Sequence, residues 1–206
     1  MTNTMSTDRA DAPVEHECFT TFIAEVEELR SRRLGDQALA SAVGERLSVL
    51  LRTREWLREE HLIGRPDRYQ QHVIHVAADG GFSVVSLIWR PGQQTSIHDH
   101  VSWCVVGVYE GEEQETRYSV HEQDGARFLT PVDILRAGPG RTVALVPPEE
   151  DVHKVTNVGA GRAVSIHVYG ADIAQLGSSI NHCFTDLPIR ENPGAAPRVS
   201  WRAIYG

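Results

Sequence analysis

Residues 92–100 of this chain, GQQTSIHDH, place His98 and His100 one residue apart. Side chains alternate between the two faces of a β-strand, so a strand here points both imidazoles to the same side. Two imidazoles on one face can hold a metal ion, and a neighbouring strand can supply a third ligand. We expect that ligand to be His153, which follows a proline turn in residues 147–157, PPEEDVHKVTN. The pattern therefore predicts a three-histidine metal site.

Short segments rich in valine, isoleucine, threonine and aromatic residues lie on both sides of this stretch. Turn signals made of glycine and proline separate them. Many short strands at such spacing favour a β-sandwich or a closed barrel. The expected strands include residues 72–77, 82–89, 103–109, 116–121, 142–146 and 163–169, with a possible last strand near Trp201.

The N-terminal part has a different composition. Residues 1–13 are small, polar or charged and predict a flexible tail. From 14 to 64, alanine, leucine, glutamate and arginine dominate and apolar residues recur at helical spacing. We therefore expect one domain over residues 14–206, with a helical cap at 14–64 and a β-barrel at 67–206.

The overall composition excludes several classes of protein. The chain of 206 residues has a formal net charge of -8 and no run of lysine and arginine, so nucleic acid is not an expected partner. No apolar run approaches the ~20 residues of a membrane span, and the N-terminus has no apolar core of a signal peptide. Three widely spaced cysteines do not suggest a disulfide framework. We expect a location in the reducing cytoplasm.

Two glycines stand at defined distances from the histidine pair. Gly92 precedes His98 by six positions, and Gly111 lies downstream. This spacing resembles the first motif of the cupins, in which a glycine, five residues and H-x-H precede a glutamate and a second glycine. Cys104 occupies the glutamate position. Because that glutamate is a metal ligand in many cupins, its replacement implies a site of three histidines.

The segment around the third histidine resembles the second cupin motif, P-x-G-x-x-H-x-x-x-N. Pro148, His153 and Asn157 match it, and Glu150 takes the place of the glycine. The resemblance implies a mostly β protein with N-terminal helices and a cupin fold. That fold is a double-stranded β-helix, or jelly-roll-like barrel.

A third segment contains residues that could take part in catalysis. Ser165, His167 and Tyr169 alternate in an S-x-H-x-Y pattern, so a strand places all three on one face. In that arrangement the serine can orient the histidine, and the histidine can orient the tyrosine hydroxyl. Together with the two histidine motifs, this string resembles the thiol dioxygenase branch of the cupins, which includes cysteine dioxygenase and 3-mercaptopropionate dioxygenase. The similarity runs from about residue 69 to residue 169.

That resemblance implies a specific reaction. His98, His100 and His153 would bind Fe(II), although imidazole also suits Ni(II) and other divalent metals. The enzyme would oxidise a small thiol, cysteine or a related mercapto acid, with O2 to the sulfinic acid. Tyr169, tuned by His167 and Ser165, would lie over the substrate.

Cys104 has a second possible role. It falls where mammalian-type cysteine dioxygenases carry a cysteine that is crosslinked to the active-site tyrosine. Two interpretations stay open at this point: a thioether between Cys104 and Tyr169, or a buried free cysteine.

The substrate contacts depart from the family pattern. Tyr69 and Gln71 occupy a Y-x-R position at which cysteine-type members bind the substrate carboxylate through an arginine. Mercaptopropionate-type members have an arginine in the loop after the S-x-H-x-Y tyrosine, but residues 170–182 contain none. An Arg–carboxylate pair is the expected way to orient such a substrate. Either another residue replaces it, with Arg90, His72 and His182 as candidates, or the substrate differs.

Other functions remain as alternatives. A related metal cupin oxygenase of secondary metabolism could take cysteine to another oxidised product, such as a sulfonamide. The chain could also be a different metal cupin enzyme that acts on carbon bonds, or a non-enzymatic cupin that binds a small molecule. Metal analysis followed by a thiol-dependent oxygen uptake assay separates these functions.

Overall fold

The computed structural model describes residues 16–148, 151–191 and 196–200. The tail expected at residues 1–13, Glu150 of the second motif and Trp201 of the expected last strand lie outside the described residues. Two α-helices, α1 (Glu17–Ser31) and α2 (Asp36–Leu50), and a 3-10 helix, η1 (Glu59–Leu62), precede all the described strands.

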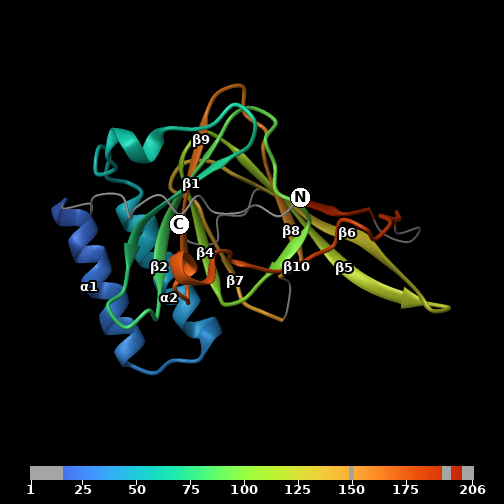
Figure 1. The fold of residues 1–206 in the computed structure, drawn as a ribbon, viewed down its shortest axis with the longest axis horizontal. Helices are drawn as coiled ribbons and strands as arrows, with labels where there is room; N and C mark the ends of the chain where they lie inside the picture. Colours follow the sequence, from blue (N-terminus) through green and yellow to red (C-terminus); the bar gives the residue numbers. More distant parts are fainter. Residues whose placement is uncertain (1–15, 149–150, 192–195, 201–206) are drawn as a thin grey trace.

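The strands form two sheets (Figure 1). The five-stranded sheet has the order β1 (Gln70–Val76), β2 (Ser83–Trp89), β9 (Ala163–Tyr169), β4 (Cys104–Glu110) and β7 (Thr142–Leu145). The six-stranded sheet has the order β10 (Ile180–Cys183), β3 (His98–His100), β8 (His153–Asn157), β5 (Glu113–Gln123), β6 (Ala126–Ala137) and β11 (Arg198–Ser200). A short helix, α3 (Ile173–Leu176), links β9 to β10.

The fold is mostly β with N-terminal helices and has the double-stranded β-helix arrangement expected from the sequence. The hydrogen bonds divide the described strands between two sheets, however, and do not close one continuous barrel. The two sheets face each other, as in a jelly roll. Each of the six strands expected between residues 72 and 169 overlaps an observed one.

One long strand, β6, is absent from the expected set. It runs antiparallel to β5 along its whole length, but it contains Pro131. Proline cannot donate a backbone hydrogen bond, so within sheets it is confined to edges and irregularities. Pro131 lies opposite Tyr118, where the register between the two strands shifts. The proline obscures the strand pattern in the sequence, and the structure accommodates it at a bulge.

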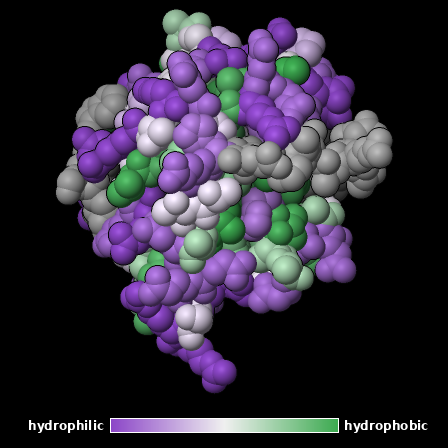
Figure 2. All heavy atoms as spheres, turned by 90° about the vertical axis from the view of Figure 1, so that its left-hand side faces the viewer, coloured by the Kyte–Doolittle hydropathy of each residue, from purple (hydrophilic) through white to green (hydrophobic). Residues whose placement is uncertain are grey.

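The two longer helices cover the outer face of the five-stranded sheet. The apolar side of α1, including Phe22 and Val26, shares a buried cluster with residues of α2 and of β2, β4 and β9. Close approach of α2 to β4 depends on Gly107, because a Cβ there would lie 2.9 Å from Leu47 Cδ2 of α2. With its apolar residues turned inward, the molecule presents a largely hydrophilic surface on this side (Figure 2). Among the described residues, no helix has the length and apolarity needed to cross a membrane.

Candidate metal centre

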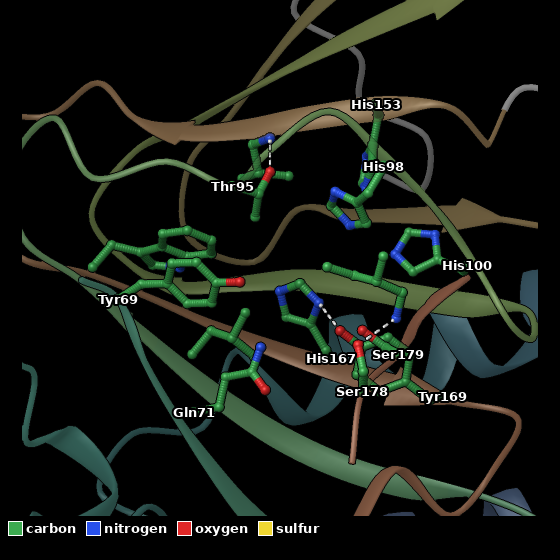
Figure 3. A pocket seen from close by; sticks show the side chains of 14 residues that line it. Tyr69, Gln71, Thr95, His98, His100, His153, His167, Tyr169, Ser178 and Ser179 are labelled. Atoms are coloured by element: carbon green, nitrogen blue, oxygen red, sulfur yellow. Dashed lines mark hydrogen bonds between the residues drawn. The ribbon is translucent and has the colours of Figure 1, made fainter. Parts of the chain in front are cut away.

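The three predicted metal ligands meet between the sheets. His98 and His100 come from β3, and His153 comes from β8, where it lies directly opposite His98. One nitrogen from each of the three imidazoles lies within 4.8 Å of the other two, and all three residues are buried. The strand alternation predicted for His98 and His100 thus places both rings in one cluster with His153 (Figure 3).

Each imidazole is held in place through its Nδ1 atom. His98 Nδ1 donates to the carbonyl oxygen of Ser96 (2.9 Å), and His100 Nδ1 donates to Asp151 Oδ1 (2.6 Å). His153 Nδ1 donates to Glu115 Oε1 (3.2 Å). Since a neutral imidazole carries one N–H, these bonds leave the lone pair on Nε2 in all three rings. Carbonyl and carboxylate partners of this kind are typical of metal-binding histidines.

The residues present fit a divalent metal. His153 Nε2 is buried and has no hydrogen-bond partner among the described residues, as expected for a nitrogen whose partner is a metal. Burial lowers the pKa of His98 well below its usual value, and the nearby His153 and His100 add to that effect. A neutral ring keeps the lone pair that a metal requires.

The two supporting carboxylates are ionised. Burial raises the pKa of Glu115, but the hydrogen bond from His153 and the ion pair with Arg117 (2.8 Å) outweigh it and hold the pKa at about 2. Burial likewise acts to raise the pKa of Asp151, and the hydrogen bonds from His100 bring it below its usual value. Both negative charges increase the basicity of the rings they orient.

The S-x-H-x-Y residues form the expected relay on β9. Ser165 Oγ lies 3.0 Å from His167 Nε2, and Tyr169 Oη lies 3.0 Å from His167 Nδ1. Trp89 Nε1–H donates to Ser165 Oγ at 3.1 Å, which adds a fourth residue to the chain. Burial, with a further contribution from His100 and His153, lowers the pKa of His167 to about 3. The imidazole is therefore neutral and can accept a proton on one nitrogen while donating from the other.

The relay ends next to the histidine cluster. The rings of Tyr169 and His100 have centroids 6.2 Å apart. Burial raises the pKa of Tyr169 well above its usual value, and the nearby Cys104 adds to that effect. The hydroxyl is therefore protonated and available as a hydrogen-bond donor beside the three histidines.

Cys104 and Tyr169 face each other across two neighbouring strands. They are paired residues in the β4–β9 register, and Cys104 Sγ lies 4.0 Å from His167 Nδ1. Cys104 is fully buried, and burial raises the pKa of its thiol well above the usual value. The two side chains named for a possible thioether are thus brought together.

A pocket opens beside the cluster (Figure 3). Tyr69 and Gln71 line it opposite the histidines, and Tyr69 stacks on Trp89 with ring centroids 4.5 Å apart. Ser178 and Ser179, from the segment after α3, also line it. Among the described residues, no arginine or lysine is part of the lining. The pocket therefore presents hydroxyl, amide and imidazole groups to a ligand.

The three replacement candidates for a carboxylate-binding arginine do not line this pocket. Arg90 is exposed, and His72 Nε2 donates to the carbonyl oxygen of Ile63 (3.0 Å). His182 is exposed and bonds Asp99.

Several functional neighbours were not identified from the sequence. Asp151 and Glu115 support two of the metal ligands, while Ser178 and Ser179 line the pocket. Asp151 could have been predicted from the sequence. It stands two residues before His153, so in an extended segment the two side chains point to the same side. Nothing local singles out Glu115, because its partner lies 38 positions away.

The fold and the three-histidine cluster define a protein of the cupin type with a site that can hold a metal. Within that class, the chain belongs to the family described as cysteine dioxygenase type I, whose model matches residues 15–177.

Solved structures resemble parts of the chain. A protein with a double-stranded β-helix domain from Klebsiella pneumoniae is 18% identical over 58% of this chain and 86% of its own, with a TM-score of 0.43. A cupin superfamily protein from Desulfitobacterium hafniense is 11% identical over 61% of this chain and 88% of its own, with a TM-score of 0.37.

Proposed function

We propose that this protein is an iron-dependent thiol dioxygenase, which oxidises cysteine or a related mercapto acid with O2 to the sulfinic acid. Membership of the cysteine dioxygenase type I family supports the reaction class. The observation that carries the proposal is the meeting of two groups at one pocket. The three histidines of the cluster, each with a free lone pair on Nε2, lie beside Tyr169. The hydroxyl of Tyr169 is hydrogen-bonded to His167.

In this proposal the three histidines hold Fe(II). The metal, when bound, supplies the redox chemistry that adds both atoms of O2 to sulfur, and Ni(II) or another divalent ion is the alternative occupant. Asp151 and Glu115 keep two of the rings in the tautomer that binds metal. The chain itself contributes orientation, proton transfer and a buried, water-poor site.

Tyr169, His167 and Ser165 act on the substrate side. Because the Tyr169 hydroxyl is protonated and buried, it donates a hydrogen bond into the pocket when His167 does not accept that proton. Tyr69 and Gln71 contact the end of the substrate remote from sulfur, together with the hydroxyls of the 178–179 segment. Because the described lining contains no arginine or lysine, neutral hydrogen-bond donors hold the end of the substrate remote from sulfur.

The protein is proposed to act as a monomer in the cytoplasm, where ferrous iron and free thiols persist. Its described cysteines, Cys18, Cys104 and Cys183, are all free, as expected in a reducing compartment. Neither nucleic acid nor a membrane has a part in the proposed reaction. Light scattering of the purified protein tests the monomer.

Oxygen uptake by the anaerobically iron-loaded protein tests the function. Cysteine, 3-mercaptopropionate and cysteamine are supplied in turn, and the products are identified by mass. Uptake that depends on one thiol and yields a product heavier by two oxygen atoms supports the proposal. No uptake with any thiol, despite one bound iron per chain, contradicts it. A sulfur-bound nitrogen in the product would favour the sulfonamide alternative.

Two histidine variants provide the matched control. His153→Ala removes a proposed ligand and is expected to abolish both metal binding and uptake. His182→Ala changes an exposed histidine outside the pocket lining and is expected to retain both.

A further inference from the structure

A second cavity lies between the two sheets and borders one of the proposed metal ligands. Six aliphatic side chains form most of its lining: Val106, Val108, Leu135, Ala137, Val143 and Val155. His153 and Val155 also line the pocket described above, so β8 is the common wall of the two spaces. Glu115, which accepts the hydrogen bond from His153 Nδ1, lines only the second cavity. That cavity therefore reaches the Nδ1 side of the His153 ring.

The cavity extends from the surface to the three-histidine cluster. Among its lining residues Arg141 is exposed, and Val106, Ala137 and Val143 are half-buried. Val106 and Val143 are paired in the register of β4 and β7, so they stand side by side at this end. The rest of the lining, including His153, is buried. The space is therefore open near β7 and closed at His153.

The lining offers little to a polar occupant. Glu115 is already paired with Arg117 and His153. Glu113 is 3% exposed, and its Oε1 atom has no partner among the described residues. A buried water molecule typically needs two to four polar partners, which one carboxyl oxygen among aliphatic side chains does not supply. The cavity therefore favours a small apolar molecule.

The size of the cavity limits that molecule to a few atoms. Its volume, measured as the space open to the centre of a water molecule, is about 30 Å³. About 10–15 Å³ of such space holds one water, so two bonded oxygen atoms fit. Dioxygen is apolar and passes readily from water into apolar surroundings. The first pocket, by contrast, presents hydroxyl, amide and imidazole groups, which suit the polar end of a thiol.

Resting on the proposed function, we propose that the second cavity admits dioxygen and holds it beside the metal centre, while the thiol enters through the pocket lined by Tyr69 and Gln71. The gas then has a route that a bound thiol does not block. Val155 borders both spaces, so it is the side chain that dioxygen passes on its way to the cluster.

Methyl NMR of the metal-free protein tests the occupant itself. Dioxygen is paramagnetic and speeds the relaxation of methyl protons near it. Spectra of valine- and leucine-labelled protein are compared under nitrogen and under pressurised oxygen. We expect a larger enhancement at Val108, Leu135 and Val155 than at two reference residues. Val49 is 57% exposed and reports on dissolved gas, while Val164 is fully buried outside the cavity and reports on the packed core. An enhancement no larger than at both references overturns the inference.

Two substitutions at the open end change the access. Val143→Phe places a ring in the opening and should abolish the enhancement at Val108 and Val155, whereas Val143→Ala should keep it. Val132→Phe is the matched control, because Val132 is 36% exposed on β6 and lines neither space. It should retain the wild-type enhancement. Were Val143→Phe to fail to fold, the wild type and Val143→Ala would decide, since absence of the enhancement in both contradicts the inference.

Steady-state kinetics of the iron-loaded protein test the route. Val143→Phe should lower kcat/KM for O2 by about 10-fold, at the small end of the range over which association rates vary among variants of one site. At saturating O2, kcat/KM for the thiol should stay at the wild-type value, and Val132→Phe should keep both constants. An unchanged kcat/KM for O2 in Val143→Phe, or an equal loss of both constants, overturns the inference. If the wild type consumes no O2 with any thiol, the proposed function fails, whereas the relaxation data still decide whether the cavity takes up dioxygen.

Discussion

His100 and Asp151 are joined by two hydrogen bonds, one from the backbone N–H of His100 to Asp151 Oδ2 (2.7 Å) and one from His100 Nδ1 to Asp151 Oδ1 (2.6 Å). The carboxylate therefore fixes both the strand position and the ring of one proposed ligand. The side chains of both residues are only 2% exposed, so water cannot replace either bond. This pairing ties β3 to the segment that precedes β8.

Asp151→Asn should weaken metal binding. An amide can still accept one bond, but it lacks the charge that increases the basicity of the ring, so we expect a loss of metal affinity of about 10- to 100-fold. Competition with a chelator, followed by metal analysis, measures it. Asp99→Asn is the control, because Asp99 lies between the two β3 ligands and bonds the exposed His182. Unchanged affinity in Asp151→Asn would show that this carboxylate has no role in metal binding.

The facing positions of Cys104 and Tyr169 predict a thioether after turnover with iron, thiol and O2. The bond replaces the thiol S–H and one ring C–H, so the crosslinked chain is lighter by two hydrogen atoms. Peptide mass mapping before and after turnover checks the prediction, with Cys104→Ser as the variant that cannot form the link. Two separate, unmodified peptides after many turnovers would leave Cys104 as a buried free cysteine.

Glu113 should make stability depend on pH in one defined window. Its pKa is about 7 in the folded protein because burial raises it from the ordinary glutamate value of 4.5, so the folded state binds more protons between these values. The free energy of unfolding should therefore fall as pH rises through this window, by about 3 kcal/mol in total. Glu115, with a folded pKa of about 2, has the opposite sign and acts only at lower pH.

Urea unfolding on either side of that window measures the effect. Glu113→Gln should lose this decline and be more stable than the wild type above pH 7, whereas Glu112→Gln should keep the wild-type slope. Identical slopes in the wild type and Glu113→Gln would contradict the raised pKa of Glu113.

Gln71→Arg should change which thiols the enzyme prefers. It adds a cation to a pocket whose described lining has no lysine or arginine. A guanidinium pairs with carboxylates, so KM for mercapto acids should fall relative to KM for cysteamine. The control is Gln70→Arg, since the preceding residue does not line the pocket. Steady-state oxygen uptake provides both KM values, and an unchanged ratio would place the substrate carboxylate elsewhere.

Local motifs were sufficient for most of the strands and for the proposed ligands, but not for the carboxylates that support those ligands. His98, His100 and the Ser165–Tyr169 string were predictable because strand alternation places residues two apart on one face. The strand β6 was missed because Pro131 interrupts its pattern, and the bulge that accommodates it depends on the partner strand. None of Arg90, His72 and His182 lines the pocket, because which side chains reach it depends on how the strands and loops pack.

The sequence by itself determined the jelly-roll class, the three histidines that meet in space and the serine–histidine–tyrosine relay. The relay and the His98–His100 pair follow from spacing of two residues within one segment, whereas His153 and the fold class follow from further segments read together with the cupin resemblance. Only the tertiary structure decided that Glu115 supports His153, that Ser178 and Ser179 line the pocket, and that Glu113 is buried. These relationships join strands distant in sequence. Their pairing is set by the packing of two whole sheets, and burial between those sheets determines which carboxyl groups stay ionised.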